Sequence, residues 1–292
     1  MSADDAGASQ APGSHVAILT RPAGQSAELA ECLLAQGWQV YDWPALLLTG
    51  LPAIDVPQPS AFDLVMCVSG NAVRFYFEQL AAARGTAEAA WPRDVPIAVV
   101  GPTSAAAVRA ASNGRIDVIA PPLDAPSFDS EALWARLQSL PQMPRKVLIV
   151  RGGEGPQGHG RSWLAERLVE SGAQVTLHAA YRRTAAIWPA QRMRQLRAWR
   201  ASGLRPVWHV SSREALTSIL QQVGTTAAIA GWAGSRIVVP HARIAQALVE
   251  IADSCGAATR VAAGPGTAAD PACIVIQTSM PTDAAVFATI VN

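Results

Sequence analysis

Hydroxyl, amide and basic side chains recur along this chain where a short β-branched run gives way to an Ala/Leu-rich stretch of helical period. The positions are Thr20, Arg21, Ser69, Asn71, Thr103, Ser104, Ser211, Ser212 and His241. In a parallel sheet the ligand crevice lies at the carboxyl ends of the strands, where helix N-termini present unpaired N–H groups and a partial positive charge. We therefore predict a ligand site at these strand ends.

The same residue types are also ordinary helix N-caps, and capping is the simpler interpretation of each position taken alone. Ser211 and Glu214 have the spacing of a capping box. Capping and ligand binding do not exclude each other, so both roles stay open at this point.

A glycine-rich stretch follows one predicted strand and contains Gly155-x4-Gly160-Arg161-Ser162. This differs from a phosphate-binding loop at Arg161, because the required lysine acts there as a compact point charge. The departure favours a loop over the cleft, and it leaves a P-loop phosphotransferase as a minor alternative that nucleotide-dependent thermal stabilisation would reveal. The sequence has no Ser-His-Asp set, paired catalytic carboxylates or H-E-x-x-H helix, so conventional catalytic equipment is scarce.

Length and composition predict two compact domains. The chain has 292 residues, of which 50 % are hydrophobic and 15 % charged, as in globular proteins with domains of about 150 residues. The net charge of +1 predicts no nucleic-acid or membrane partner. Residues 1–14 predict a disordered tail with no signal peptide, and no transmembrane helix is expected. The cysteines, which predict neither disulfides nor a metal site and indicate a cytoplasmic protein, are Cys32, Cys67, Cys255 and Cys273.

β-Branched runs alternate with helical stretches over the whole chain, which predicts an α/β fold with parallel sheets. The predicted strands are too numerous for one small sheet. They cover residues 16–20, 63–68, 97–100, 116–120, 146–150, 207–210, 236–239, 259–263 and 273–277.

Two extended, aromatic segments, residues 39–50 and 175–186, break this rhythm. If they pair as crossing linkers, at residues 39–44 and 179–186, the middle of the chain forms one domain over residues 45–178. Residues 15–38 and 187–292 then form the other. A division into sequential halves near residues 141–144 would also satisfy the pattern.

Arginine is concentrated between Ser171 and Arg213, a stretch with no Asp or Glu. On the predicted helix at residues 191–200 the arginines indicate a solvated face. Arg182 and Arg183 lie beside Tyr181 on the second linker, where guanidinium groups could bind carboxylates through two hydrogen bonds. The tryptophans indicate core packing.

Several motifs in order make the chain from Val16 onwards resemble the uroporphyrinogen-III synthase family. They are Ile18-Leu-Thr-Arg-Pro22, Val68-Ser-Gly-Asn-Ala-Val73, Val100-Gly-Pro-Thr-Ser-Ala-Ala-Ala-Val108, Leu148-Ile-Val-Arg-Gly-Gly153, which includes Arg151, and Ala180-Tyr-Arg-Arg183. The resemblance implies two doubly wound, flavodoxin-like α/β domains joined by a two-stranded β-ladder hinge, with the N-terminal βα unit completing the C-terminal domain.

The same resemblance implies the reaction. Hydroxymethylbilane, a linear tetrapyrrole with eight carboxylates, would be cyclised to uroporphyrinogen III with inversion of ring D and loss of water, without a cofactor. Tyr181 matches the hinge tyrosine of the family and would assist departure of the substrate hydroxyl. Because the substrate cyclises unaided to the wrong isomer, the main task of the protein would be to hold one conformation.

The chain departs from the family pattern in its second half. Where the family has a Gly-Pro-x-Thr motif, this sequence reads Val239-Pro-His-Ala-Arg243, so His241 or Arg243 would replace the hydroxyl. The competing interpretation is a non-catalytic two-domain α/β sensor of a small ligand. Further expectations are a monomer and a possible contact with the upstream hydroxymethylbilane synthase.

Overall fold

The computed structural model describes residues 15–52, 54–86, 89–125, 127–153 and 159–292. The predicted tail at residues 1–14 and the centre of the glycine-rich stretch lie outside the described residues. The chain divides into two compact units. Unit 1 comprises the residues up to Leu47 and from Thr184 onwards, and unit 2 comprises Leu48–Arg183. The two ends of the chain thus share one unit, rather than forming sequential halves that meet near residues 141–144.

Unit 1 is built on a six-stranded sheet, sheet A, with the order β11-β12-β10-β9-β1-β2. All five neighbouring pairs are parallel. The strands are β1 (Val16–Leu19), β2 (Gln39–Asp42), β9 (Val207–His209), β10 (Arg236–Val239), β11 (Thr259–Ala263) and β12 (Ile274–Thr278). The helices are α1 (Ala27–Ala35), α6 (Ala190–Ala201), α7 (Arg213–Val223), α8 (Thr225–Trp232), α9 (Ala242–Ser254) and α10 (Asp283–Val291).

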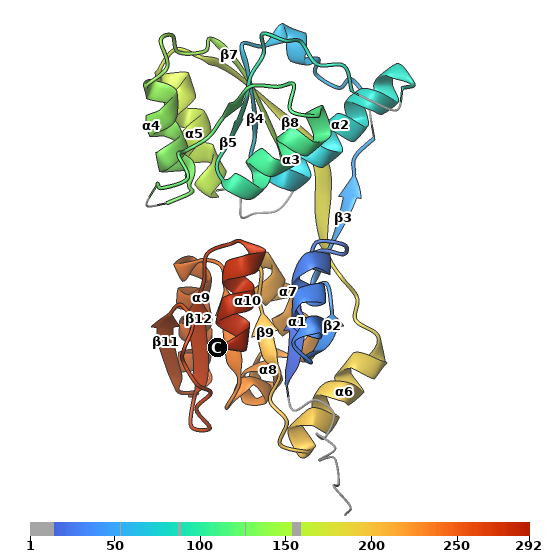
Figure 1. Ribbon diagram of the computed structural model, residues 1–292, viewed down its shortest axis with the longest axis vertical. Helices are drawn as coiled ribbons and strands as arrows, with labels where there is room; N and C mark the ends of the chain where they lie inside the picture. Colours follow the sequence, from blue (N-terminus) through green and yellow to red (C-terminus); the bar gives the residue numbers. More distant parts are fainter. Residues whose placement is uncertain (1–14, 53, 87–88, 126, 154–158) are drawn as a thin grey trace, which may run out of the picture. The chain divides into compact units, whose positions relative to one another are not determined.

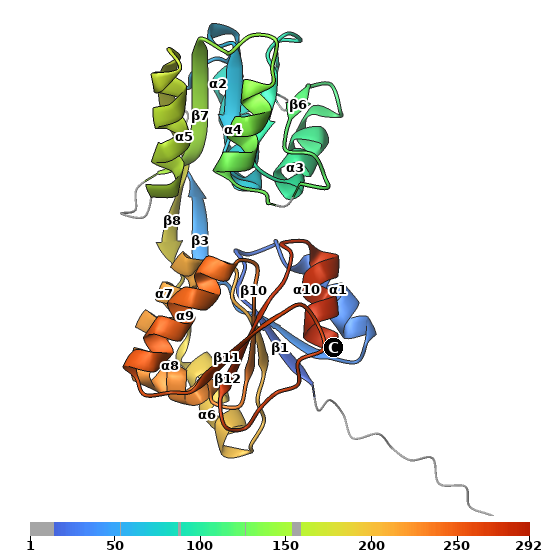
Figure 2. The ribbon, with the colours of Figure 1, turned by 90° about the vertical axis from the view of Figure 1, so that its left-hand side faces the viewer.

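Helices cover both faces of sheet A, and β1 shows why. Val16 and Ile18 pack into one cluster with α7, α8 and α9, whereas Ala17 and Leu19 pack on the other face with α1 and α10. Figure 2 shows these two helix layers with the sheet between them. Alternate residues of a strand point to opposite faces, so a strand buried on both faces must be apolar throughout. The run Val16–Leu19 meets this condition.

The larger cluster of unit 1 is rich in tryptophan, which confirms the packing interpretation of these side chains. The Trp43 ring stacks on Trp199 at 5.6 Å between centroids and meets Trp188 edge-on at the same distance. The Arg192 guanidinium lies 5.4 Å from the Trp43 ring centre and makes a cation–π contact with this ring.

Unit 2 is built on a second six-stranded sheet, sheet B, with the order β3-β8-β7-β4-β5-β6. The strands are β3 (Leu46–Gly50), β4 (Leu64–Cys67), β5 (Ile97–Val99), β6 (Val118–Ile119), β7 (Lys146–Gly153) and β8 (Gln174–Ala185). Helices α2 (Gly70–Arg84) and α3 (Pro102–Ser112) cover one face, and α4 (Ser130–Gln138) and α5 (His159–Glu170) cover the other (Figure 1).

The chain crosses between the units within β3 and within β8, which are neighbours in sheet B. The N–H of Ala186 donates to the carbonyl of Ala45, and the N–H of Leu51 donates to the carbonyl of Ala180. From the first bond to the second, the residue number rises along β3 and falls along β8, so the two strands are antiparallel. The other pairs of sheet B with a defined register are parallel.

The predicted fold class, α/β with two sheets of mostly parallel strands and helices on both faces, is confirmed. Two local predictions differ from the structure. Residues 39–42, expected in a linker, form β2 and pair with β1, because Val40 and Tyr41 pack against the clusters of unit 1. Helix α8 was not among the predicted elements.

Candidate functional site

The carboxyl edge of sheet A carries the N-termini of α1, α7, α9 and α10, and the last three of these have a side-chain cap. Ser212 Oγ accepts the N–H of Ala215 at the start of α7, at 3.0 Å. His241 Nδ1 accepts the N–H of Arg243 at the start of α9, at 3.1 Å, and both residues are exposed. Thr282 caps α10 in the same way. A capped helix end satisfies one of its unpaired N–H groups and leaves others available to a ligand.

The capping box expected from Ser211 and Glu214 is wrong. Helix α7 begins one residue later than that pattern requires, so Ser212 is the N-cap. Ser211 instead faces the end of β1, where its N–H donates to Thr20 Oγ1 at 3.4 Å.

The alanine variants of these two adjacent serines should therefore differ in stability. We expect Ser212→Ala to lower the free energy of unfolding by about 1 kcal/mol, because it removes an N-cap bond. Ser211→Ala is the matched control: it removes only the long 3.5 Å hydrogen bond from Ser211 Oγ to the carbonyl of Thr20, so it should change the free energy of unfolding by less than about 0.5 kcal/mol. Urea denaturation measures both values, and equal effects of the two variants would contradict the assignment of Ser212 as the cap.

Thr20 joins the ends of two neighbouring strands. It is fully buried, and its hydroxyl donates to the carbonyl of His209 at 2.8 Å while accepting the Ser211 N–H. Its hydrogen-bonding capacity is used inside unit 1. The structure thus gives Thr20 a role in fixing the strand ends, and it offers no hydroxyl surface to a ligand.

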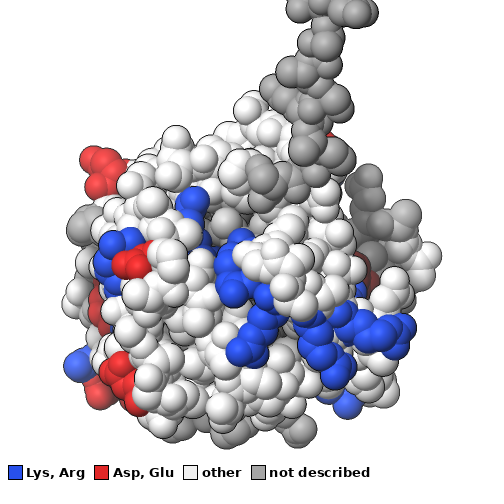
Figure 3. Space-filling view, turned by 90° about the horizontal axis from the view of Figure 1, so that it is seen from below, with Lys and Arg blue, Asp and Glu red and all other residues white. Residues whose placement is uncertain are grey.

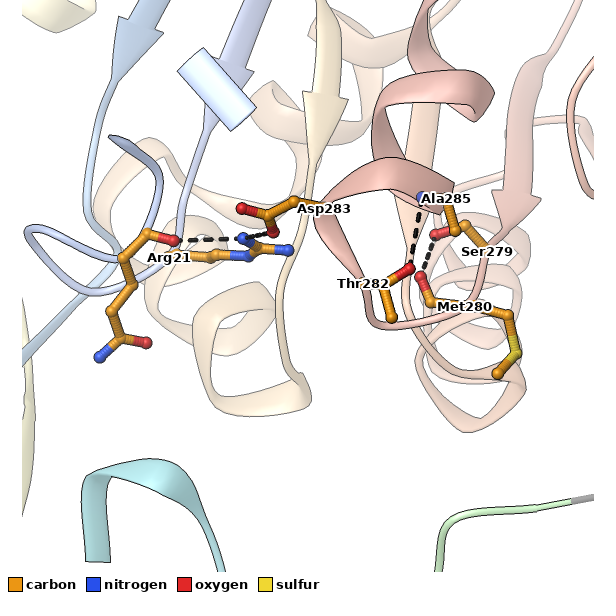
Figure 4. Close-up of polar contacts among 7 residues, drawn as sticks. Arg21, Ser279, Met280, Thr282, Asp283 and Ala285 are labelled. Atoms are coloured by element: carbon orange, nitrogen blue, oxygen red, sulfur yellow. Dashed lines mark hydrogen bonds and ion pairs between the residues drawn. The ribbon is translucent and has the colours of Figure 1, made fainter. Parts of the chain in front are cut away.

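Arg21 follows Thr20 and forms an ion pair with Asp283, the first residue of α10 (Figure 4). Its Nη1 donates both to Asp283 Oδ1 and to the carbonyl of Gln25. The exposed fractions of the two side chains are 15 % for Arg21 and 25 % for Asp283. The pair connects the first βα unit of the chain with the last helix, a contact between residues 262 positions apart.

His209 is a polar residue of this edge that the sequence analysis missed. Its side chain is buried at the end of β9, and neither ring nitrogen has a hydrogen-bond partner among the described residues. Burial, together with the smaller effect of the positive charge of Arg21, lowers the pKa of His209 to about 3. The imidazole is therefore neutral near pH 7. Its only sequence signal is a histidine inside the apolar run Val207–Val210.

The carboxyl edge of sheet B presents further helix N-termini, of which those of α2 and α3 carry predicted site residues. Ser69 is the N-cap of α2, and its Oγ accepts the N–H of Ala72 at 3.2 Å. Asn71 lies in the first turn of that helix and is half-buried. Helix α3 begins after Gly101 without a side-chain cap, with Thr103 exposed and Ser104 buried in its first turn. Its first backbone amides are thus not satisfied by a capping side chain.

Tyr181 lies in the core of unit 2 with its hydroxyl at this edge. The ring is 1 % exposed and stacks on Phe75 at 5.1 Å between centroids. The hydroxyl oxygen lies 3.2 Å from Ser69 Oγ, and either group can donate the hydrogen. The structure thus brings together two of the predicted residues of unit 2, one from β8 and one from the start of α2.

A β-bulge places Tyr181 there. Arg151 on β7 pairs with Ala179, but Gly152 pairs with Tyr181, so Ala180 is the extra residue. Ala180 and Tyr181 both pack into the same core, which strict alternation along a strand would forbid. A Cβ on Gly152 would lie only 3.0 Å from Tyr181 Cζ, so glycine at this position leaves room for the ring. Arg151, half-buried on β7, directly precedes the bulge.

The arginines of α6 belong to a different surface. Arg194, Arg197 and Arg200 are exposed, and their spacing places them along one side of the helix. Figure 3 shows basic side chains gathered on one face of the molecule with few acidic ones among them. Helix α6 leads into the amino end of β9, away from the strand ends described above. The interpretation of a solvated helix face is retained.

Within the described part of the chain, no cluster of three or more His, Cys, Asp or Glu side chains could hold a metal ion. The helices of that part are also too short or too polar to cross a membrane.

Comparison with known proteins adds a family and a fold. The family model described as Uroporphyrinogen-III synthase HemD matches residues 26–263. A mutant uroporphyrinogen III synthase from the extremely thermophilic bacterium Thermus thermophilus is 16 % identical over 81 % of this chain and 89 % of that chain, with a TM-score of 0.51. The uroporphyrinogen-III synthetase of Helicobacter pylori is 12 % identical over 93 % and 96 %, with a TM-score of 0.49. The Thermus structure supports a shared fold, and the family match covers elements α1 to β11.

Proposed function

The chain belongs to the uroporphyrinogen-III synthase family, and on this premise we propose that the carboxyl edge of each sheet binds part of the substrate hydroxymethylbilane. The enzyme is a cyclising lyase that forms uroporphyrinogen III with inversion of ring D and loss of water. The observation that carries this function is the family match over residues 26–263. A non-catalytic ligand sensor is not favoured, and the isomer of the product formed from hydroxymethylbilane tests the function directly.

Binding would rely on backbone N–H groups more than on a basic pocket. The substrate is polyanionic, and the N-termini of α2, α3, α7 and α9 each combine unpaired amides with the positive end of a helix dipole. Several weak donors spread over two edges suit an extended ligand with eight carboxylates. Holding that ligand in one conformation favours closure to a single isomer, since positioning alone lowers the barrier of a step the substrate can perform unaided.

The chemical assistance would come from unit 2. Loss of the substrate hydroxyl leaves a stabilised azafulvenium cation, which the substituted carbon of ring D attacks to give a spiro intermediate. We propose that Tyr181 donates a hydrogen bond to the departing hydroxyl and that Ser69 orients the phenol. The 3.2 Å contact between their oxygens supports this pairing. The other candidate binding residues of unit 2 are Asn71, Thr103, Ser104 and Arg151, and those of unit 1 include Arg21, Ser212, His241 and Arg243.

If recognition is distributed in this way, no single hydroxyl should be essential. We expect Ser69→Ala, Ser104→Ala and Ser212→Ala each to lower kcat/KM by about tenfold or less, or roughly 1.4 kcal/mol, because neighbouring N–H donors remain. Steady-state kinetics on folded variants measures the effect. Complete loss of activity from one of these changes would contradict distributed binding.

Other features of the enzyme stay proposals. We propose that the β3–β8 crossing acts as a hinge, since the chain passes between the units only there, and small-angle scattering with and without product would detect closure. A cytoplasmic location, a monomeric state and a contact with the upstream hydroxymethylbilane synthase are further expectations. Sedimentation analysis of the enzyme alone and mixed with the synthase tests the last two.

A further inference from the structure

Arg21, at the carboxyl edge of sheet A, uses only some of the hydrogen-bond donors of its guanidinium group. Arg21 Nη1 makes both hydrogen bonds of the guanidinium, to Asp283 and to the carbonyl of Gln25 (Figure 4). Within the described residues, Nε and Nη2 of Arg21 make none. Neither atom is among the buried polar atoms that lack a partner, so both reach solvent.

Nε and Nη2 form the side of the guanidinium that can bind a carboxylate through two parallel hydrogen bonds. Such a pair is stronger and more directional than a single contact, provided that the guanidinium keeps one orientation. The Arg21 side chain is only 15 % exposed. A ligand therefore reaches it from one side, and the orientation of the group decides whether the free pair of donors faces that ligand.

Asp283 is well placed to fix this orientation. It is the first residue of α10, whose N-cap Thr282 accepts the N–H of Ala285 at 3.3 Å. The positive end of that helix stabilises the carboxylate. Helix α10 is anchored in turn, because its Val286 and Ile290 pack with residues of α1 in one buried cluster.

His209, whose imidazole lies close to Arg21 inside unit 1, is unsuited to fixing the orientation of the guanidinium. His209 is buried without a hydrogen-bond partner among the described residues, and its lowered pKa keeps the imidazole uncharged near pH 7. The only ion pair of Arg21 in the described part of the chain is the one with Asp283. The orientation of the guanidinium thus depends on that carboxylate, with support from the carbonyl of Gln25.

We propose that Asp283 is a positioning residue for substrate binding, which holds Arg21 so that its Nε and Nη2 donate to one carboxylate of the tetrapyrrole. The inference rests on the proposed function, because that function supplies the polycarboxylate ligand. The role of Asp283 is indirect, because of these two residues Arg21 touches the substrate and Asp283 does not.

Three variants test this role by the split between KM and kcat. Asp283→Ala should raise KM for hydroxymethylbilane about fivefold with kcat unchanged, because binding is weakened before the chemical step. Asp283→Asn keeps an oxygen that accepts the Nη1 hydrogen and should recover most of the loss. In an Arg21→Gln background, Asp283→Ala should add nothing. A general loss of stability would not produce this pattern.

A matched control lies at the other end of the same sheet. Asp270 precedes β12 and pairs with Arg260 at 3.6 Å, so Asp270→Ala removes an ion pair of unit 1 at the amino edge of sheet A. Its KM should equal that of the wild type. An unchanged or lowered KM for Asp283→Ala would overturn the inference, and a lowered value would indicate that Asp283 competes with the substrate for Arg21.

Binding of uroporphyrin, followed by its fluorescence, separates this inference from the proposed function. The Kd of this octacarboxylate should rise about fivefold in Asp283→Ala, with recovery in Asp283→Asn. If the wild type forms no uroporphyrinogen III, the function fails and the Kd series still decides the role of Asp283. If the wild type is active but Asp283→Ala changes neither Kd nor KM, the inference is wrong while the proposed function stands.

Discussion

Tyr181→Phe is expected to lower kcat roughly 10- to 100-fold, at or below the lower end of what proton-transfer groups contribute. The variant loses only the hydroxyl that would assist departure of the substrate hydroxyl. That hydrogen bond forms chiefly in the transition state, so the Kd of the product should hardly change. The melting temperature should also stay close to that of the wild type, since the ring keeps its stack on Phe75 and its fit against Gly152.

The neighbouring core phenol provides the control. Tyr76 is fully buried in the same cluster, and its hydroxyl donates to the carbonyl of Pro57. Tyr76→Phe removes a hydroxyl from the same core without touching Ser69, and kcat should be unchanged. Tyr181→Ala should instead unfold at lower temperature, because it leaves a large cavity. If Tyr181→Phe turns over like the wild type and still gives only isomer III, Tyr181 is a packing residue.

The second large effect is a loss of stability in mild acid that His209 causes. Burial holds the pKa of His209 at about 3 in the folded protein, below its ordinary value of 6.5. The unfolded chain therefore binds one more proton between these pH values, and the free energy of unfolding falls as the pH drops below 6.5. At pH 5 the loss from this one group is about 2 kcal/mol, and it continues to grow until about pH 3.

His209→Leu isolates this contribution. Neither ring nitrogen has a hydrogen-bond partner among the described residues, so an apolar side chain should cost little at pH 7.5. At pH 5 the variant should be more stable than the wild type by about 2 kcal/mol relative to their difference at pH 7.5. Thermal unfolding at both pH values measures this. A difference between the two proteins that is independent of pH would show that His209 does not titrate in this way.

The sequence was sufficient to predict the strands whose residues are all buried. The all-apolar runs of β1 and β4 predict strands covered on both faces, and the structure places them so. The strand at residues 39–42 was missed because its side chains are only partly buried, so no run or alternation marks it. Helix α8 has glycine before its first residue and within its last turn, and both positions weaken the helical signal.

The site was less accessible to sequence reasoning, because its decisive contacts are non-local. A hydroxyl at a strand end identified Ser69, and the resemblance to the family identified Tyr181, but neither showed the bulge at Ala180 that brings the two residues together. The sequence also does not show that Gly152, which lies in one of the family motifs, makes room for the Tyr181 ring. The partner of Arg21, Asp283, lies 262 residues away in the sequence. The two residues come together only when sheet A has formed and α10 has packed on it.

The most direct measurement is the isomer composition of the porphyrins obtained from hydroxymethylbilane. The substrate is made enzymatically and incubated with and without the purified protein. The products are then oxidised and separated by chromatography. With the protein, isomer III should dominate and its fraction should rise with protein concentration, because the bound chain closes with ring D inverted. A product mixture identical to that of the protein-free sample, from a folded protein, would contradict the assigned function.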